Sequence, residues 1–107
     1  MEFQVQKRYF DLIKSWLKIY EWRLSKDKYR HLKVWDIITF KPNWSDEFVE
    51  KKVTSIHIYW SFADAGLHLW IEKIVPGTSN IGSMVETYRE FYSKEDEERY
   101  NVIMIGF

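Results

Sequence analysis

The stretch IKSWLKIYEWRL, residues 13–24, joins the end of a helix to the start of a strand. Up to residue 15, apolar side chains recur every three or four positions, which predicts a helix over residues 7–15. From residue 18 the pattern changes to alternation, which predicts a strand over residues 18–24. The alternation sorts this strand into one side with Ile19, Glu21 and Arg23 and another side with Lys18, Tyr20, Trp22 and Leu24.

Outward from this stretch, apolar runs alternate with breaks that contain Gly, Pro, Ser or Asn. Runs of β-branched and aromatic residues predict further strands, and helical spacing predicts two longer helices. Ser61, Asn80 and Ser93 are expected to cap helices, the last of them short and charged. The predicted strands are residues 2–5, 34–40, a long strand within 48–60, and 101–107; the predicted helices are residues 62–72, 81–92 and the segment after Ser93. This order predicts the α+β class, as a small mixed β-barrel with helices packed around it.

Composition limits the kind of protein. The chain has 107 residues, which predicts a single domain over residues 1–107. Its 16 basic and 16 acidic residues give zero net charge, which disfavours a phosphate backbone as partner. It has no cysteine, and His31, His57 and His68 follow no metal-ligand spacing, so we expect no metal and no cofactor. No apolar run reaches membrane-spanning length, so we expect no membrane partner and, for a natural protein, a cytoplasmic location.

Several motifs, spread over nearly the whole chain, point to a known family. They read IKS-x-x-K-x-x-E-x-R-L, LKV-x-DIITF, I-x-x-Y-x-S-F, VPG and YREFYSKEDEERY, followed by a terminal strand. Together they resemble the ASCH domain, a family of the PUA-like β-barrel group. The resemblance implies a PUA-like barrel, a cleft that contains Lys18, Glu21 and Arg23, and binding of RNA or a nucleotide.

One branch of that family resembles an amidohydrolase of acetylated cytidine, with a Lys-x-x-Thr pair in its cleft. Lys18 matches the lysine, but Glu21 occupies the threonine position. The nucleophilic threonine is therefore missing, and we expect a non-catalytic protein. A Glu–Lys pair could transfer a proton if burial shifted its pKa values. The simpler interpretation is an ion pair of Glu21 with Lys18 or Arg23 at the mouth of the cleft.

The sequence also departs from the family pattern. Trp16 and Trp35 stand where the family usually has glycine, and a turn before residues 36–40 would need a positive φ. Trp22 stands where many members have a small residue, and Leu67 and Trp70 stand where members carry charge. Core packing explains any single tryptophan, but not large residues gathered at glycine positions. These departures predict a redesigned ASCH-like scaffold with exposed aromatic residues.

Three functions remain open. The first is a binding protein whose aromatic-rich surface contacts another protein, since interfaces use tryptophan as an anchor. The second is a small-molecule binder for an apolar or aromatic ligand, in a pocket that Ala65 and Gly66 open and that Trp22, Trp35 and Tyr59 wall. The third is a natural ASCH domain that stacks RNA bases or a nucleotide on tryptophan. The expected contact residues are Trp16, Trp22, Trp35, His57, Tyr59, Trp60, Ala63, Asp64, Leu67, His68, Trp70 and Met84.

Overall fold

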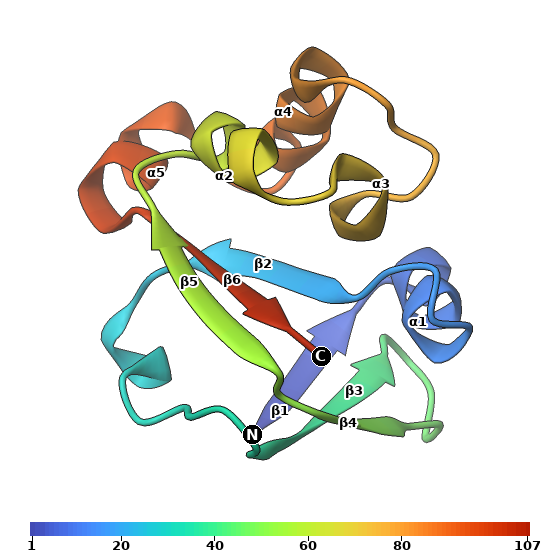
Figure 1. Cartoon of the computed structure of the whole chain (residues 1–107). Coiled ribbons are helices and arrows are strands. Elements are labelled where there is room, and N and C mark those ends of the chain that lie inside the picture. The colour runs from blue at the N-terminus through green and yellow to red at the C-terminus, as the bar shows by residue number, and fades with distance from the viewer.

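The computed structural model describes residues 1–107 and contains two three-stranded sheets (Figure 1). In the first sheet, β3 lies between β1, which runs parallel to it, and β4, which runs antiparallel. In the second sheet, β6 pairs antiparallel with both β2 and β5. The strands are β1 (Glu2–Val5), β2 (Tyr20–Leu24), β3 (Ile37–Pro42), β4 (Val49–Lys52), β5 (Ser55–Tyr59) and β6 (Val102–Gly106). The α+β class is therefore as predicted, but the strands form two separate sheets and no closed barrel is shown.

The helices gather mainly on one side of the second sheet, as Figure 1 shows for α2 to α5. They are α1 (Lys7–Lys14), α2 (Phe62–His68), α3 (Ile71–Ile74), α4 (Ile81–Arg89) and α5 (Lys94–Tyr100), with a single 3₁₀ turn, η1 (Asp27–Tyr29), after β2. The three expected caps are confirmed, because the side chains of Ser61, Asn80 and Ser93 each accept a hydrogen bond from a backbone N–H three residues on, at 3.0, 2.9 and 3.1 Å. None of the helices is long and apolar enough to cross a membrane.

Two predicted elements are divided in the structure. The long strand within residues 48–60 breaks at Val53 and Thr54, where the chain leaves one sheet for the other: the Val53 N–H donates to Asp36 and the Thr54 N–H donates to Gly106. The predicted helix over residues 62–72 ends at His68, because Leu69 is extended. Gly66 weakens that helix, and the break lets Leu69 and Ile74 both reach the core.

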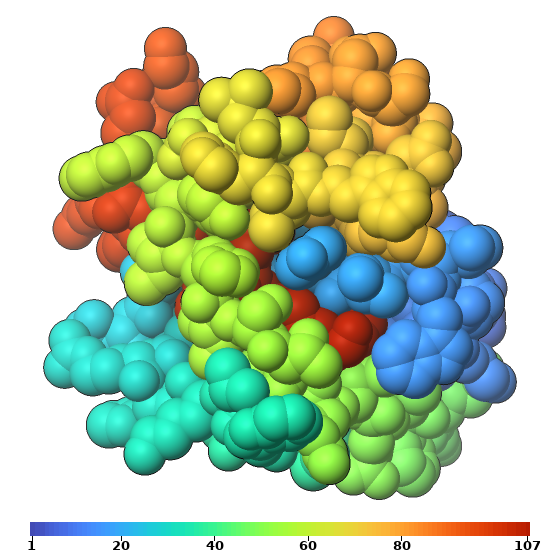
Figure 2. Space-filling view, in the orientation of Figure 1, coloured from blue at the N-terminus to red at the C-terminus, as the bar shows by residue number.

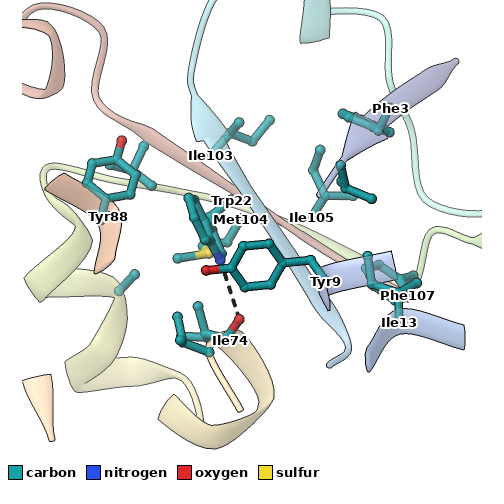
Figure 3. Packing of buried hydrophobic residues seen from close by; sticks show 14 of the residues in the cluster. Phe3, Tyr9, Ile13, Trp22, Ile74, Tyr88, Ile103, Met104, Ile105 and Phe107 are labelled. Carbon is teal, nitrogen blue, oxygen red and sulfur yellow. Dashed lines mark hydrogen bonds between the residues drawn. The ribbon is translucent and has the colours of Figure 1, made fainter. Parts of the chain in front are cut away.

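Trp22 lies at the centre of the helix-facing core, and only 5% of it is exposed (Figure 3). The interface role expected for it is therefore wrong. It points from β2 toward the helices and meets the rings of Tyr9, Phe62, Tyr88, Phe91 and Tyr92 at centroid distances between 5.3 and 6.4 Å. Its Nε1–H donates to the carbonyl oxygen of Ile74 at 3.3 Å, which satisfies the one polar atom of the buried indole.

The small residues of α2 allow that helix to approach α4. A Cβ atom placed on Gly66 would lie 2.5 Å from Cε of Met84, closer than real carbon atoms approach. Ala65 and Met84 are both fully buried. The expectation that Met84 contacts a partner is therefore wrong, and Ala65 and Gly66 open no ligand pocket; they serve helix packing.

Candidate functional site

The structure brings Lys18, Glu21 and Arg23 together at the start of β2. Glu21 is almost fully buried, and its Oε2 accepts from Nε of Arg23 at 2.9 Å and lies 2.7 Å from Nη2. The Arg23 guanidinium also donates to the carbonyl oxygen of Gln4 on β1 at 3.0 Å. This is the ion pair that the sequence predicted, and it links the edges of the two sheets.

Lys18 is held away from solvent, with 1% exposed. Its ammonium group donates to the carbonyl oxygens of Tyr20 and, at 2.7 Å, Ile74, and it lies 4.0 Å from Oε1 of Glu21. Burial lowers the pKa of Lys18 to about 8; the negative charge of Glu21 opposes this shift, and the positive charge of Arg23 adds to it. Lys18 therefore serves mainly to join β2 to α3.

A cavity of about 180 Å³ opens beside this charged group. Aromatic rings make up much of its wall, and Glu21 and Arg23 supply charge. Its lining residues are Gln4, Val5, Gln6, Tyr9, Glu21, Trp22, Arg23, Asn43, Phe91 and Tyr92. Burial raises the pKa of Tyr9 and of Tyr92 above the ordinary value, so both phenols keep their protons at neutral pH. We call this cavity the cleft.

Glu21 offers the cleft an unused acceptor. Oε2 is taken by Arg23, whereas Oε1 accepts no hydrogen bond from the protein, because its nearest cation, Lys18 Nζ, lies 4.0 Å away. An acceptor without a partner in the protein can accept a hydrogen bond from a ligand that reaches it. The ion pair holds the carboxylate still, so the cleft presents an acceptor in a fixed position next to aromatic rings.

Sequence reasoning missed several cleft residues. Tyr9 comes from α1, Asn43 follows β3, and Phe91 and Tyr92 follow α4. Tyr9 lies within the predicted helix over residues 7–15 and Asn43 lies between two predicted strands, so the sequence singles out neither residue. Phe91 and Tyr92 belong to the motif YREFYSKEDEERY, which was available as a signal. Of the pocket walls predicted from the sequence, Trp22 lines the cleft, but Trp35 and Tyr59 do not.

The other five tryptophans are exposed. Trp16 and Trp35, expected to be exposed, are 58% and 70% exposed, and both have positive φ, 67° and 81°. The expected positive φ at the turn before residues 36–40 is thus confirmed. Trp44 also has a positive φ, 63°, which the sequence did not indicate. Trp60 and Trp70 are exposed as well, and so is Leu67.

Lysines cover three of these indoles. Nζ of Lys51 lies 3.0 Å from the ring centroid of Trp16, Lys52 lies 5.6 Å from Trp35, and Lys73 lies 5.3 Å from Trp70. Lys51 itself is almost buried, and desolvation lowers its pKa. These pairs are cation–π contacts, which fix otherwise solvent-exposed rings.

The remaining predicted contact residues lie on β5 and α2, away from the cleft. His57, Tyr59 and His68 form a row of rings, with centroids 6.1 Å and then 5.5 Å apart. Nδ1 of His68 lies 2.9 Å from the carbonyl oxygen of Asp64, and Ala63 is half-buried. Figure 2 shows β5 and the α2–α3 segment at the surface, with part of β6 visible in the hollow beside them.

Two sheets, a helical layer and an aromatic-walled cleft beside a buried ion pair describe a small α+β domain. Solved structures similar to it include two proteins. Hypothetical protein PH0355, known from a crystal structure, is 36% identical with a TM-score of 0.87, and the match covers 98% of this chain and 94% of that one. Protein PF0455 from Pyrococcus furiosus, known from solution NMR, is 31% identical with a TM-score of 0.75, covering 99% and 94%. The chain therefore belongs to the same family as these two proteins. No protein-family model and no curated protein matches it.

Proposed function

We propose that the chain is a non-catalytic, ASCH-like domain whose cleft binds one planar heteroaromatic group, such as the base of a nucleotide or of single-stranded RNA. The observation that carries the proposal is that Glu21, whose Oε1 makes no hydrogen bond within the protein, lines a cavity walled by aromatic rings. A nucleobase offers N–H donors at its edge and a flat apolar face, so it matches both features. The proposal includes the fold family: the two sheets would belong to a PUA-like barrel.

The size and polarity of the cleft support a single base over a larger ligand. Its volume of about 180 Å³ is below the roughly 300 Å³ at which pockets for drug-sized ligands begin. Amide groups of Gln4, Gln6 and Asn43 add donors and acceptors around the rim. With zero net charge, the chain has little attraction for a long phosphate backbone, so affinity would come from the base.

The same geometry supports a binding role over a catalytic one. The lining residues include no serine, threonine or cysteine, and burial raises the pKa of Tyr9 and of Tyr92, so neither phenol is activated as a nucleophile. Lys18 is absent from the lining, and its ammonium group is engaged by two carbonyl oxygens. Glu21 is held in place by Arg23, so it is positioned as an acceptor.

The test is a titration followed by two-dimensional NMR, with the four common nucleosides, N4-acetylcytidine and a short single-stranded RNA. Saturable shifts of residues around the cleft are expected for at least one base-containing ligand. Glu21→Gln should weaken that binding about tenfold, because it replaces one carboxylate acceptor. Glu90→Gln is the matched control, since Glu90 forms only an exposed ion pair with Arg8.

Two results would refute the proposal. One is the absence of saturable binding by every ligand. The other is an equal effect of Glu21→Gln and Glu90→Gln in proteins with the same melting temperature. Turnover of acetylated cytidine that Lys18→Ala abolishes would refute the non-catalytic part alone.

A second candidate function rests on a different observation, the exposure of five of the six tryptophans. We propose that they contact a protein partner that presents apolar pockets flanked by carboxylates, because lysines accompany Trp16, Trp35 and Trp70. On this proposal the tryptophans of a redesigned scaffold serve as anchors. A display selection for binding peptides or domains, repeated with Trp70→Ala, tests it.

Trp70→Ala should weaken selected binders by about 2 kcal/mol, roughly 30-fold, and leave the melting temperature nearly unchanged, because Trp70 is exposed. Selected binders whose affinity is unchanged by Trp70→Ala would exclude Trp70 as an anchor. Unfolding of the variant would instead mark Trp70 as part of the core.

A further inference from the structure

The outer edge of β5 makes no hydrogen bond to a side chain and carries no charged residue. The Arg23 guanidinium engages the Gln4 carbonyl on β1, and Lys18 engages the Tyr20 carbonyl on β2. The edge strand β4 reads VEKK, and lysines of this kind discourage another strand from pairing. By contrast, β5 pairs only with β6 and reads SIHIY, with no proline and no Asp, Glu, Lys or Arg. Figure 1 shows β5 with no strand on its other side.

We propose that β5 is a dimerisation edge, at which two copies of the chain pair their Ser55–Tyr59 strands antiparallel about a two-fold axis at His57. This inference does not rest on ligand binding in the cleft. It does not rest on the second candidate function either, because the paired strands do not include Trp16, Trp35 or Trp70.

The sequence of the strand is self-complementary in this register. With His57 opposite its own copy, Ile56 faces Ile58 of the second copy, and Ser55 faces Tyr59. Because side chains alternate between faces, four isoleucines then form one continuous apolar face across the new pair. A shift by one residue would place Ile58 against His57, and a shift by two would leave fewer residues paired.

The area available fits a weak dimer. Ile58 is 61% exposed and Trp60, directly after the strand, is 80% exposed. A side chain of each kind can cover roughly 100 and 200 Å² respectively when buried. With the backbone edge and the half-buried Ile56 and Tyr59, the two copies together would bury on the order of 1,000 Å², near the lower limit for a specific interface. A strand of another sequence would not reproduce the pairing of Ile56 with Ile58 and of Ser55 with Tyr59.

The chain contains no cysteine, so a single introduced thiol reports the register. In the proposed dimer the two residues at position 57 lie opposite each other, with Cα atoms roughly 4.5–5.5 Å apart, within the range of a disulfide. His57→Cys should therefore form a covalent dimer under mild oxidation. Ser55→Cys is the matched control, because the two thiols would be four residues out of step, roughly 13 Å apart. Its crosslinking should be at least tenfold slower.

Sedimentation velocity of the cysteine-free chain, from about 10 μM to about 1 mM, should show a dimer whose fraction rises with concentration, because this range covers the dissociation constants of weak dimers. Ile58→Lys should abolish it by placing charges inside the paired edge, while Phe48→Lys, at an exposed residue in the loop before β4, should leave it intact. A monomer throughout that range would overturn the proposal. Equal crosslinking of the two cysteine variants, or a dimer that survives Ile58→Lys, would overturn it as well.

Discussion

Replacing Trp44 by glycine is expected to stabilise the fold, although it removes the largest side chain. Trp44 has φ of 63° and is fully exposed, so its indole contributes no packing that the substitution could remove. For a residue with a Cβ atom, the left-handed conformation costs roughly 1–2 kcal/mol. Glycine removes that cost but loses roughly 0.5–1 kcal/mol of additional chain entropy on folding. The net expectation is a gain of about 0.5–1 kcal/mol.

Trp60→Gly provides the matched control. Trp60 is also highly exposed, but its φ is not positive, so glycine brings the entropy cost without relief of strain. The two variants should therefore differ by about 1–2 kcal/mol, with Trp44→Gly the more stable. Trp35→Gly should fall between them, because relief at φ of 81° is offset by loss of the contact with Lys52, worth roughly 0.5 kcal/mol.

Thermal melts by circular dichroism measure the difference directly, since 1 kcal/mol moves the melting temperature of a domain of this size by roughly 4–8 °C. Urea titration of the same variants checks that the slope is unchanged, so that a shift in midpoint reports stability. Equal melting temperatures for Trp44→Gly and Trp60→Gly would refute the strain argument. A Trp44→Gly variant that melts well below the wild type would show that the indole packs in the folded protein.

Three further outcomes are expected. Trp22→Ala should lower the free energy of unfolding in urea by about 3–5 kcal/mol, because it empties the centre of the aromatic core, and a smaller loss than 1 kcal/mol would contradict the observed burial. Glu97→Ala should cost about 2–3 kcal/mol in the same assay, because it leaves the Phe62 N–H and the Arg89 guanidinium, now 2.7 and 2.9 Å from the carboxylate, without an acceptor. The free energy of unfolding should rise by about 2 kcal/mol between pH 7.5 and 9.5, because folded Lys18, with its pKa lowered to about 8, releases a proton that the unfolded chain keeps up to about pH 10.5. The Lys18→Met variant should show a flatter pH profile, and a profile unchanged by this substitution would assign the titration to another group.

Local signals made much of the fold predictable. Ser61, Asn80 and Ser93 act within one helical turn, so a cap can be recognised without knowing what the helix packs against. The alternation over residues 18–24 likewise identified β2. The long strand within 48–60 was predicted as one piece, because the transfer of Val53 and Thr54 from one sheet to the other depends on partners elsewhere in the chain.

The site was only partly predictable, for the same reason. Lys18, Glu21 and Arg23 are neighbours along one strand, so their grouping could be read from the motif that resembles ASCH domains. Trp22 is buried by Phe62, Tyr88 and Phe91, which come much later in the chain, and nothing in its own neighbourhood indicates that cover. Met84 is buried because Gly66 allows α4 to approach α2 closely, and the sequence of α4 alone does not indicate this contact.

The carbonyl oxygen of Ile74 accepts from both Lys18 and Trp22, and it is free to do so because α3 ends there. In a helix continuing past residue 74, that oxygen would accept from a backbone N–H four residues on, as carbonyls inside a helix do. Because the acceptor belongs to the main chain, replacing Ile74 by another apolar residue removes neither bond. Sequence drift in this family can therefore exchange the side chain at position 74 freely for another of similar size. What has to be preserved is the end of α3 at residue 74, which depends on the length and conformation of the main chain and not on one particular side chain.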